Sequence, residues 1–331
     1  MKNVLENLYK QRYLTEEEAS DILIKFARGN YNPSQMASFL TVFRMRNITV
    51  EELKGFRNAM LELCISIDFD EFNTIDLCGT GGDAKNTFNI STLASFVSAG
   101  AGAQVIKHGN YSVSSSCGSS NVLEYFGYKF SNDQTKLREE LDRTGFCFMH
   151  APLFHPAMKN IAPVRKDLGV QTFFNMLGPL VNPGNPKNQL IGVFSPEVGR
   201  LFNYFYQELD KHYTIVHSLD GYDEISLTGP TKVEGLSGSQ ILTPEDFGFE
   251  RIDPEAIEGG HDVASSAKIF HDILQGNGTD AQNKVVIANS AVALNTMWPE
   301  KSLEQCIIMA EDSLYGKKAL QVFNRLMEIQ Q

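Results

Sequence analysis

The 331-residue sequence is poor in cysteine and has no C-x-x-C pair, because its five cysteines lie far apart at 64, 78, 117, 147 and 306. This spacing offers neither a zinc motif nor a dithiol redox motif and is typical of a reducing compartment, so we expect a cytoplasmic protein. Cys78 stands beside a glycine-rich stretch and could be a nucleophile. A small buried packing residue is the simpler interpretation, and we interpret all five as structural.

The chain also lacks long apolar runs and an excess of positive charge. No run approaches the roughly 20 residues that a membrane helix needs, and the N-terminus has no signal-peptide core, so we expect no membrane partner. The net charge of −11 argues against a surface that coats nucleic acid, although a local basic site remains possible. With 42% hydrophobic and 21% charged residues, the composition is that of a globular protein.

Three amphipathic helices are predicted within the first 65 residues. Thr15 and Glu18 form a capping-box pattern before a helix that Gly29 ends, and Thr49 with Glu52 forms a second such pattern. Pro33 marks the start of the helix between them. Helices this short have little core of their own, so we predict a small helical domain, used partly for dimerisation.

After residue 70 the pattern changes to strands separated by helices. "TIDLCGT", "STLASFVSAGAG" and "AQVIKHG" predict a strand, a glycine loop, a helix and a second strand, which is a βαβ unit. Further predicted strands are "FCFMHAP", "QLIGVFS", "YTIVHSLDG" and "VVIANSA". We therefore predict a large α/β domain with a mostly parallel central sheet flanked by helices.

The stretch "GTGGDAKNTFNIST" (79–92) predicts an anion site. Glycines after a strand allow a sharp turn, and their successive N–H groups can hold an anion. The next helix begins near 89–92, where its free N–H groups and dipole favour phosphate. Ser91 and Thr92 could instead only cap that helix. The loop matches neither G-x-G-x-x-G nor the P-loop pattern, so neither a dinucleotide nor ATP is the default ligand.

A second polar loop, "KHGNYSVSSSCGSS" (107–120), follows the next predicted strand. Lys107 and His108 stand at the carboxyl end of that strand, where open α/β sheets bind ligands. Serine-rich loops are usually only solvated connections. Two such loops after neighbouring strands indicate a ligand with more than one phosphate group.

Two further stretches carry charged residues that the periodic pattern does not explain. Asp223 and Glu224 follow the predicted strand "YTIVHSL", and such a pair suits Mg²⁺ bound with waters and phosphates. Other adjacent acids, such as Glu245 with Asp246, are interpreted as surface residues. Arg165 lies among prolines and apolar residues and is suited to pairing with a carboxylate.

These motifs carry a resemblance to a known family. "GTGGD…TFNIST", "KHGN…GSSNVLE", "HPAMKNIAPVR…TFFNMLGPLVNP" and "DEISLTGPT" follow in the order and spacing of the anthranilate phosphoribosyltransferases. The resemblance runs from about residue 5 to the C-terminus. Any one motif would be only suggestive, whereas four in register are specific.

The resemblance implies transfer of the 5-phosphoribosyl group from phosphoribosyl pyrophosphate to the amine of anthranilate, with release of pyrophosphate, in tryptophan biosynthesis. It implies Mg²⁺, with two ions on the diphosphate substrate, and no nucleic-acid or membrane partner. It also implies a homodimer formed through the helical domain. The expected domains are 1–68, with a returning helical segment at about 165–182, and 69–331.

Site residues are carried over position by position from the family motifs. The resemblance places Lys107 at the leaving pyrophosphate, with no covalent nucleophile. It assigns the binding of phosphoribosyl pyrophosphate to Gly79, Gly82, Asp83, Thr87, Asn89, Ile90, Ser91, Thr92, Lys107, His108, Gly109, Asn110, Ser115 and Ser119. It assigns anthranilate to Gly79, His108, Asn110, His155 and Arg165, and the metal to Ser91, Asp223 and Glu224.

The chain departs from the usual family pattern at several positions. Tyr111 and Ser116 stand where arginine and lysine are common, and Cys117 stands where serine is common. Met158 stands where an aromatic residue is frequent. The loss of two cations is expected to weaken attraction to pyrophosphate, so these changes bear on substrate affinity more than on reaction type.

Three alternatives remain open at this point. A nucleoside phosphorylase of the same fold would typically carry K-x-S-T-G-G where this chain has C-G-T-G-G-D, and would lack the acid pair. A non-catalytic relative that binds nucleic acid conflicts with the acidic balance, and a salt-titrated DNA-binding assay would detect it. A transferase for another aromatic amine is the third.

Overall fold

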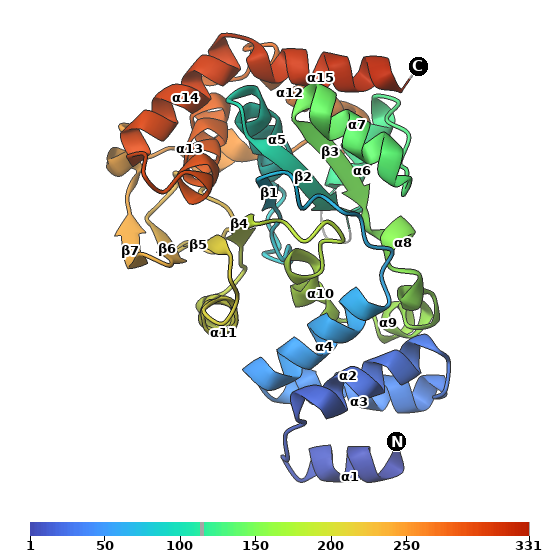
Figure 1. The fold of residues 1–331 in the computed structure, drawn as a ribbon. Helices are drawn as coiled ribbons and strands as arrows, with labels where there is room; N and C mark the ends of the chain where they lie inside the picture. The colour runs from blue at the N-terminus through green and yellow to red at the C-terminus, as the bar shows by residue number, and fades with distance from the viewer. Residues whose placement is uncertain (113–115, 331) are drawn as a thin grey trace.

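The computed structural model describes residues 1–112 and 116–330. Figure 1 shows the N-terminal helices at one end of the molecule and the sheet with its covering helices at the other. None of the helices in the described ranges is both long and apolar enough to cross a membrane.

The N-terminal helices begin and end where the sequence predicts. The capping boxes at Thr15 and Thr49 are both formed, Pro33 opens its helix, and Gly29 follows the end of α2 in a left-handed conformation (φ 72°). The structure adds one helix before them, α1. The bounds are α1 Lys2–Tyr9, α2 Glu16–Ala27, α3 Pro33–Met45 and α4 Val50–Glu62.

The described strands form one seven-stranded sheet in the order β3-β2-β1-β4-β5-β6-β7. All pairings from β3 to β5 are parallel, so the predicted fold class is confirmed. The chain moves outward from β1 to β3 and then returns to add β4 on the other side of β1. The carboxyl ends of β1 and β4 are therefore the switch point at which open α/β sheets bind ligands. The bounds are β1 Thr74–Leu77, β2 Gln104–Gly109, β3 Phe146–His150, β4 Asn188–Gly192 and β5 His212–Ser218.

An antiparallel hairpin completes the sheet, and the sequence did not predict it. It consists of β6 Thr231–Gly235 and β7 Gly238–Leu242, joined by the two residues Leu236 and Ser237. β7 lies at the edge of the sheet and is mostly exposed. Because β7 buries little surface, it does not contain the apolar run by which a strand is recognised in a sequence.

The prediction of a strand for "VVIANSA" (285–291) is wrong, because this segment lies inside the helix α13, Asp280–Met297. Residues 285–294 are buried on every side of the helix, between α5, α14 and the sheet. A helix buried all round shows no apolar and polar faces, so a short β-branched run within it resembles a buried strand. The capping box of Thr279 and Gln282 was the overlooked signal.

The other helices cover the sheet or connect its strands. The predicted helix after the glycine loop is confirmed as α5, and the helix after the second loop as α6. The bounds are α5 Ile90–Gly100, α6 Ser119–Tyr125, α7 Gln134–Thr144, α8 Ala151–Phe154, α9 Ala162–Leu168, α10 Phe174–Leu177, α11 Pro196–Tyr206, α12 Val263–Leu274, α14 Leu303–Tyr315 and α15 Lys318–Ile329, with 3₁₀ turns at 156–160, 178–180, 244–247 and 254–257.

The segment 161–181 shares its core with the N-terminal helices. Phe173 stacks on Phe56 of α4 with ring centroids 4.2 Å apart, and Phe39 and Phe43 of α3 pack edge-on around the same ring. Figure 1 shows α9 and α10 between those helices and the sheet. This shared core holds the N-terminal helices close to the carboxyl ends of the strands.

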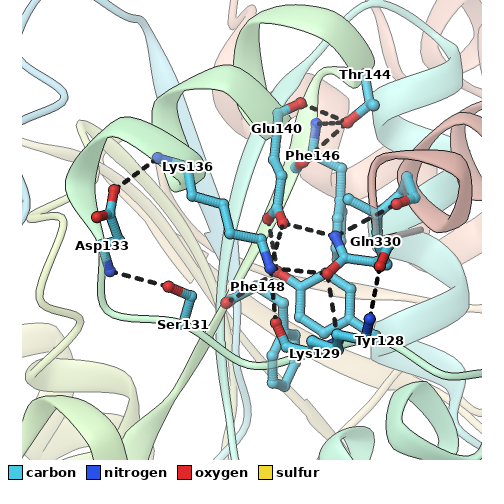
Figure 2. Close-up of polar contacts among 11 residues, drawn as sticks. Tyr128, Lys129, Ser131, Asp133, Lys136, Glu140, Thr144, Phe146, Phe148 and Gln330 are labelled. Atoms are coloured by element: carbon cyan, nitrogen blue, oxygen red, sulfur yellow. Dashed lines mark hydrogen bonds and ion pairs between the residues drawn. The ribbon is translucent and has the colours of Figure 1, made fainter.

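A buried polar cluster joins the end of the chain to α7 (Figure 2). Gln330 donates to the buried carboxylate of Glu140 (2.7 Å) and accepts from Lys136 (2.8 Å), while Tyr128 donates its hydroxyl to the same Glu140 (2.6 Å). Burial raises the pKa of Glu140, and these donors counteract that effect. The hydrogen bonds of the cluster involve none of the residues at the carboxyl ends of β1 and β4, so we interpret it as structural.

Candidate active site

The glycine loop after β1 folds over the end of β4 and faces an acidic side chain. Gly81 and Gly82 adopt positive φ angles (61° and 84°), which a turn this sharp requires. Thr80 donates its N–H to the carbonyl of Gly192 at the end of β4 (2.8 Å), and Gly81 donates its N–H to Asp223 Oδ2 (2.8 Å). The loop is therefore positioned by both β4 and the loop after β5.

The predicted acid pair meets the start of α5. Ser91 donates its backbone N–H to Glu224 Oε1 (3.0 Å), and Thr87 donates its hydroxyl to Glu224 Oε2 (3.4 Å). Burial, followed by the charge of Asp83, raises the pKa of Asp223. Burial and the charge of Asp223 likewise raise the pKa of Glu224. The carboxylates repel one another, so this arrangement favours a bound cation.

A cavity of about 20 Å³ lies between the acid pair and the glycine loop, room for about one water-sized species. No group of three or more His, Cys, Asp or Glu side chains in the described residues is arranged to hold a metal by itself. Mg²⁺ commonly takes one or two carboxylates and completes its shell with water and substrate oxygens, so the residues present fit it. The cavity is lined by Leu77, Cys78, Gly79, Ser91, Ala94, Leu190, Gly192, Val216, Asp223, Glu224 and Asn289.

Lys107 brings a positive charge to the same place. Its side chain is buried, and Nζ donates to the carbonyl of Leu77 (2.5 Å) and to Ser91 Oγ (3.4 Å). The first bond fixes the ammonium at the end of β1, and the second directs it to the start of α5. Lys107 therefore lies at the base of the glycine loop.

His108 and His155 form a pair of neutral imidazoles with ring centroids 5.4 Å apart. His108 Nδ1 lies 3.0 Å from the carbonyl of Gly178, and His155 Nε2 lies 3.0 Å from that of Val181. A carbonyl only accepts, so both of these nitrogens carry the proton. Burial lowers the pKa of His108 to about 3 and that of His155 to about 4. The opposite nitrogen of His108, Nε2, is a buried acceptor without a partner in the described part of the chain. The ring of His155 also faces the backbone carbonyl of Met60, which counteracts the effect of burial on its pKa.

Arg165 lies on α9, and the described residues provide no acidic partner within ion-pair distance of it. Its guanidinium packs over the ring of Phe174 (5.1 Å) and donates to Asn175 Oδ1 (3.4 Å). Burial lowers the pKa of Arg165, with no compensating carboxylate. An oriented cation of this kind is suited to receiving a carboxylate from a ligand.

The remaining predicted residues lie in or beside the two loops. Asp83 caps its own turn by accepting from the N–H of Lys85, and Gly82 accepts at its carbonyl from Gln171 (3.3 Å). The side chains of Ile90 and Thr92 are buried in α5, so only their backbone can face a ligand.

The second loop is tied to the first. Asn89 donates its side-chain amide to the carbonyl of Cys117 (3.0 Å). Ser119 donates to the carbonyl of Asn110 (3.3 Å), and a Cβ on Gly109 would lie 2.4 Å from Ser119 Oγ, so the loop closes tightly on the end of β2. The predicted Ser115 lies outside the described residues.

Tyr111 and Ser116, which stand where the family commonly has cations, make protein contacts instead. The Tyr111 hydroxyl donates to Glu124 of α6 (3.0 Å), and its ring packs edge-on against His150 (4.8 Å). Ser116 donates to the carbonyl of Gly260 (2.5 Å). Met158 packs against the core shared with the N-terminal helices.

The sequence analysis did not predict a role for Asp76 and Asn182, which lie under the site and support the backbone of His108. Asp76 is buried in β1 and accepts from the N–H of His108 (3.1 Å) and from the Asn182 amide (2.8 Å). Burial raises the pKa of Asp76 to about 6. An acid in the middle of the apolar run "TIDL" was the available signal, because a buried carboxylate needs specific partners.

Comparisons with known proteins match both the N-terminal helical part and the α/β part of the chain. Residues 2–64 match the helical bundle domain of the glycosyl transferase family, and residues 71–320 match its a/b domain. The chain is 55% identical to an anthranilate phosphoribosyltransferase of Flavobacterium johnsoniae and 49% identical to one of Bacteroides fragilis, with 99% of each chain covered. The chain belongs to the anthranilate phosphoribosyltransferase family of glycosyl transferases.

Solved structures of anthranilate phosphoribosyltransferases share this fold. The enzyme of Thermus thermophilus superposes with a TM-score of 0.92 at 31% identity, with 98% of each chain covered. The Saccharomyces cerevisiae enzyme, solved in complex with PRPP and Mg, superposes with a TM-score of 0.90 at 24% identity, over 98% of this chain and 96% of that one. The resemblance drawn from the four sequence motifs is thereby confirmed.

Proposed function

We propose that this protein transfers the 5-phosphoribosyl group of phosphoribosyl pyrophosphate to the amine of anthranilate, giving N-(5-phosphoribosyl)anthranilate and pyrophosphate in tryptophan biosynthesis. The observation that carries the proposal is the cluster of the glycine loop, Lys107 and the acid pair at the carboxyl end of β1. We propose that His108, His155 and Arg165 form a second half-site, supported by the contact between the two imidazoles and by the lack of an acidic partner for Arg165 among the described residues.

The first half-site suits a sugar diphosphate. The N–H groups of the glycine loop and the start of α5 favour phosphate oxygens. Mg²⁺ would be held by Asp223, Glu224 and Ser91, and when bound it supplies positive charge to the departing diphosphate. Two ions are proposed, because the three neighbouring acids Asp83, Asp223 and Glu224 carry more negative charge than Lys107 alone offsets. The solved relative with PRPP and Mg supports the binding of Mg²⁺.

The second half-site suits an aromatic amino acid with a carboxylate. Arg165 pairs with the carboxylate, His108 Nε2 receives a hydrogen bond from an amine proton, and His155 lines the anthranilate site beside it. Because both imidazoles are neutral at pH 7, they leave the amine lone pair free. Lys107 and His108 both lie at the carboxyl end of β2, which pairs with β1, so we propose that the amine lies near the diphosphate site.

The reaction forms a bond from the amine nitrogen to C1 of the ribose as the bond from C1 to the pyrophosphate oxygen breaks. The electron pair of that bond leaves with pyrophosphate, next to Lys107 and the loop N–H groups, and the amine loses one proton. Positioning of the amine against C1 and stabilisation of the leaving group account for the rate, so no side-chain nucleophile is required.

The test is the loss of anthranilate fluorescence after addition of phosphoribosyl pyrophosphate and Mg²⁺ to the purified protein. The expected result is a loss that requires both additions and releases one pyrophosphate for each anthranilate consumed. Turnover of another aromatic amine in place of anthranilate would identify a different acceptor. Pyrophosphate release without any acceptor amine would contradict the proposal.

Arg165→Ala is expected to raise the KM for anthranilate by about 10- to 100-fold, because a charge-assisted hydrogen bond to a carboxylate contributes roughly 1.5–3 kcal/mol. The KM for phosphoribosyl pyrophosphate should change little. Arg200→Ala, on the exposed side of α11, is the matched control. An unchanged KM for anthranilate in Arg165→Ala would remove the carboxylate role.

The assembly follows from the same assignment. We propose that 1–68 with the returning segment 165–182 forms one domain and that 69–331 forms the other, supported by the packing of Phe173 against Phe39, Phe43 and Phe56. The hydrophobic cluster around these rings continues into β4, α11 and β5, so the two domains share an apolar contact. We propose a homodimer through that helical domain, because Tyr9, Tyr13 and Met45 are all exposed there. A cytoplasmic location is supported by five free thiols.

A further inference from the structure

The turn 258–260, between a 3₁₀ turn (254–257) and α12, pairs with the glycine loop along its backbone. Gly259 donates its N–H to the carbonyl of Asn86 (2.6 Å), and Phe88 donates its N–H to that of Ile257 (3.4 Å). Thr87 and Glu258 form an antiparallel bridge between the two segments. A segment more than 165 residues away in the chain therefore continues the backbone pairing of the glycine loop.

Both glycines of this turn are needed for space. A Cβ on Gly259 would lie 2.7 Å from the carbonyl oxygen of Thr87, and one on Gly260 would lie 2.4 Å from the backbone nitrogen of Ser266 in α12. Neither glycine has a positive φ, so conformational freedom is not the reason for glycine here. The turn is packed backbone to backbone between α12 and the glycine loop, and neither neighbour can yield by rotating a side chain.

The same turn also holds the second loop. Ser116 donates its hydroxyl to the carbonyl of Gly260 (2.5 Å), and Asn86 donates its side-chain amide to that carbonyl (3.3 Å). Asn86 Oδ1 in turn accepts from the Ser116 N–H (3.3 Å) and lies 3.2 Å from Ser116 Oγ, whose single proton goes to the nearer Gly260 carbonyl. One residue of each loop and one carbonyl of the turn therefore form a closed polar triangle.

We infer that Asn86, Ser116 and the turn 258–260, together called the loop clasp, form a positioning element for phosphoribosyl pyrophosphate. The inference deepens the proposed function and rests on it. Both loops bind the same diphosphate, so the distance between them decides whether its contacts form together. Because the clasp fixes the distance between the two loops before the ligand binds, less conformational entropy is lost on binding.

The clasp also accounts for Ser116 where the family commonly has lysine. Ser116 donates its hydroxyl to the turn and its backbone N–H to Asn86, so it contributes through the geometry of the loops instead of through charge. None of the three clasp elements provides one of the predicted ligand residues. Their effect on the substrate is transmitted through the loops that they join.

The test compares Gly259→Ala, Asn86→Ala, Ser116→Ala and the double variant in the full-length protein with anthranilate, phosphoribosyl pyrophosphate and Mg²⁺. Gly259→Ala pushes on the glycine loop and is expected to raise the KM for phosphoribosyl pyrophosphate by about tenfold or more, since misplacement by a fraction of an ångström is costly in such sites. Asn86→Ala and Ser116→Ala should each raise it by about two- to tenfold. The KM for anthranilate should stay near that of the unmodified protein.

The double variant Asn86→Ala with Ser116→Ala separates a clasp from two independent contacts. Because the two residues bond to each other and to the same Gly260 carbonyl, the rise in KM of the double variant should be smaller than the product of the two single rises. Gly199→Ala is the control for adding a Cβ, since its nearest neighbour would lie 3.4 Å away.

Three results would overturn the inference. The first is an unchanged KM for phosphoribosyl pyrophosphate in folded Gly259→Ala, and the second is a double variant in which the effects of Asn86→Ala and Ser116→Ala multiply. The third is an equal rise in the KM for phosphoribosyl pyrophosphate and the KM for anthranilate in these variants. If Gly259→Ala does not fold, the two polar truncations decide the matter, because they add no atoms. Absence of turnover in the unmodified protein would instead contradict the proposed function.

Discussion

Glu224→Gln and Asp223→Asn are each expected to lower turnover by about 10³-fold or more. Both substitutions keep the size of the side chain and an oxygen that can accept from Ser91 or Gly81, and both remove a negative charge from the proposed metal site. A bound metal contributes several kcal/mol of charge stabilisation, and each 1.36 kcal/mol is a factor of ten in rate. The measurement is the rate of anthranilate fluorescence loss as a function of Mg²⁺ concentration.

The thermal midpoint distinguishes loss of metal from loss of fold. Removing one of several mutually repelling carboxylates should leave the midpoint of the metal-free protein equal or higher, since burial and neighbouring acids raise the pKa of both residues. Glu245→Gln, an exposed member of another acid pair, is the matched control and should behave as the unmodified protein. A near-normal rate for Glu224→Gln at limiting Mg²⁺ would mean that the metal role is wrongly assigned.

Gly192→Ala is expected to lower kcat/KM for phosphoribosyl pyrophosphate by at least about 100-fold. A Cβ at this position would lie 1.6 Å from the carbonyl oxygen of Asp223, which is near a covalent bond length. The obstructing atom belongs to the backbone, so the whole acid loop would have to move away from the end of β4. The same Cβ would lie 3.5 Å from the Cα of Gly79, and the carbonyl of Gly192 holds Thr80 of the glycine loop.

A graded series makes this prediction specific. Gly79→Ala places its Cβ 2.8 Å from Asp223 Oδ2, a side-chain atom that can adjust, so its effect should be smaller. Gly199→Ala, with 3.4 Å to its nearest neighbour, should have little effect. Circular dichroism and the thermal midpoint show whether each variant is folded. Equal kinetics for Gly192→Ala and Gly199→Ala would refute the close contact between β4 and the acid loop.

The N-terminal helices and the glycine loop could be predicted from sequence because their signals are local. A capping box such as Thr15 with Glu18 is complete within four residues, and each residue satisfies a backbone donor of the same turn. A run of glycines after an apolar strand likewise predicts a sharp turn without reference to the rest of the chain. Gly81 and Gly82 adopt the positive φ angles that such a turn uses.

The error at 285–291 and the missed hairpin have the opposite cause. Residues 285–294 of α13 are surrounded on all sides by other elements, so their environment, and not their own pattern, decides that they form a helix. β6 and β7 are recognisable only once β5 is present to pair with β6. At 285–291 the deciding contacts are with elements far away in the chain, whereas the hairpin depends on β5, which lies 13 to 21 positions before its partners in β6.

The amino-acid sequence by itself determined the α/β class, the two polar loops after β1 and β2, the acid pair and the family. Only the tertiary structure decided how these parts meet. Ser91 and Glu224 are separated by 133 positions and share a hydrogen bond. The backbone of Asp223 can lie against Gly192 only because Gly192 has no side chain. The neutral state of His108 and His155 and the clasp around Asn86 arise in the same way. The physical reason is that burial, hydrogen-bond partners and close backbone approach exist only after distant segments have packed together.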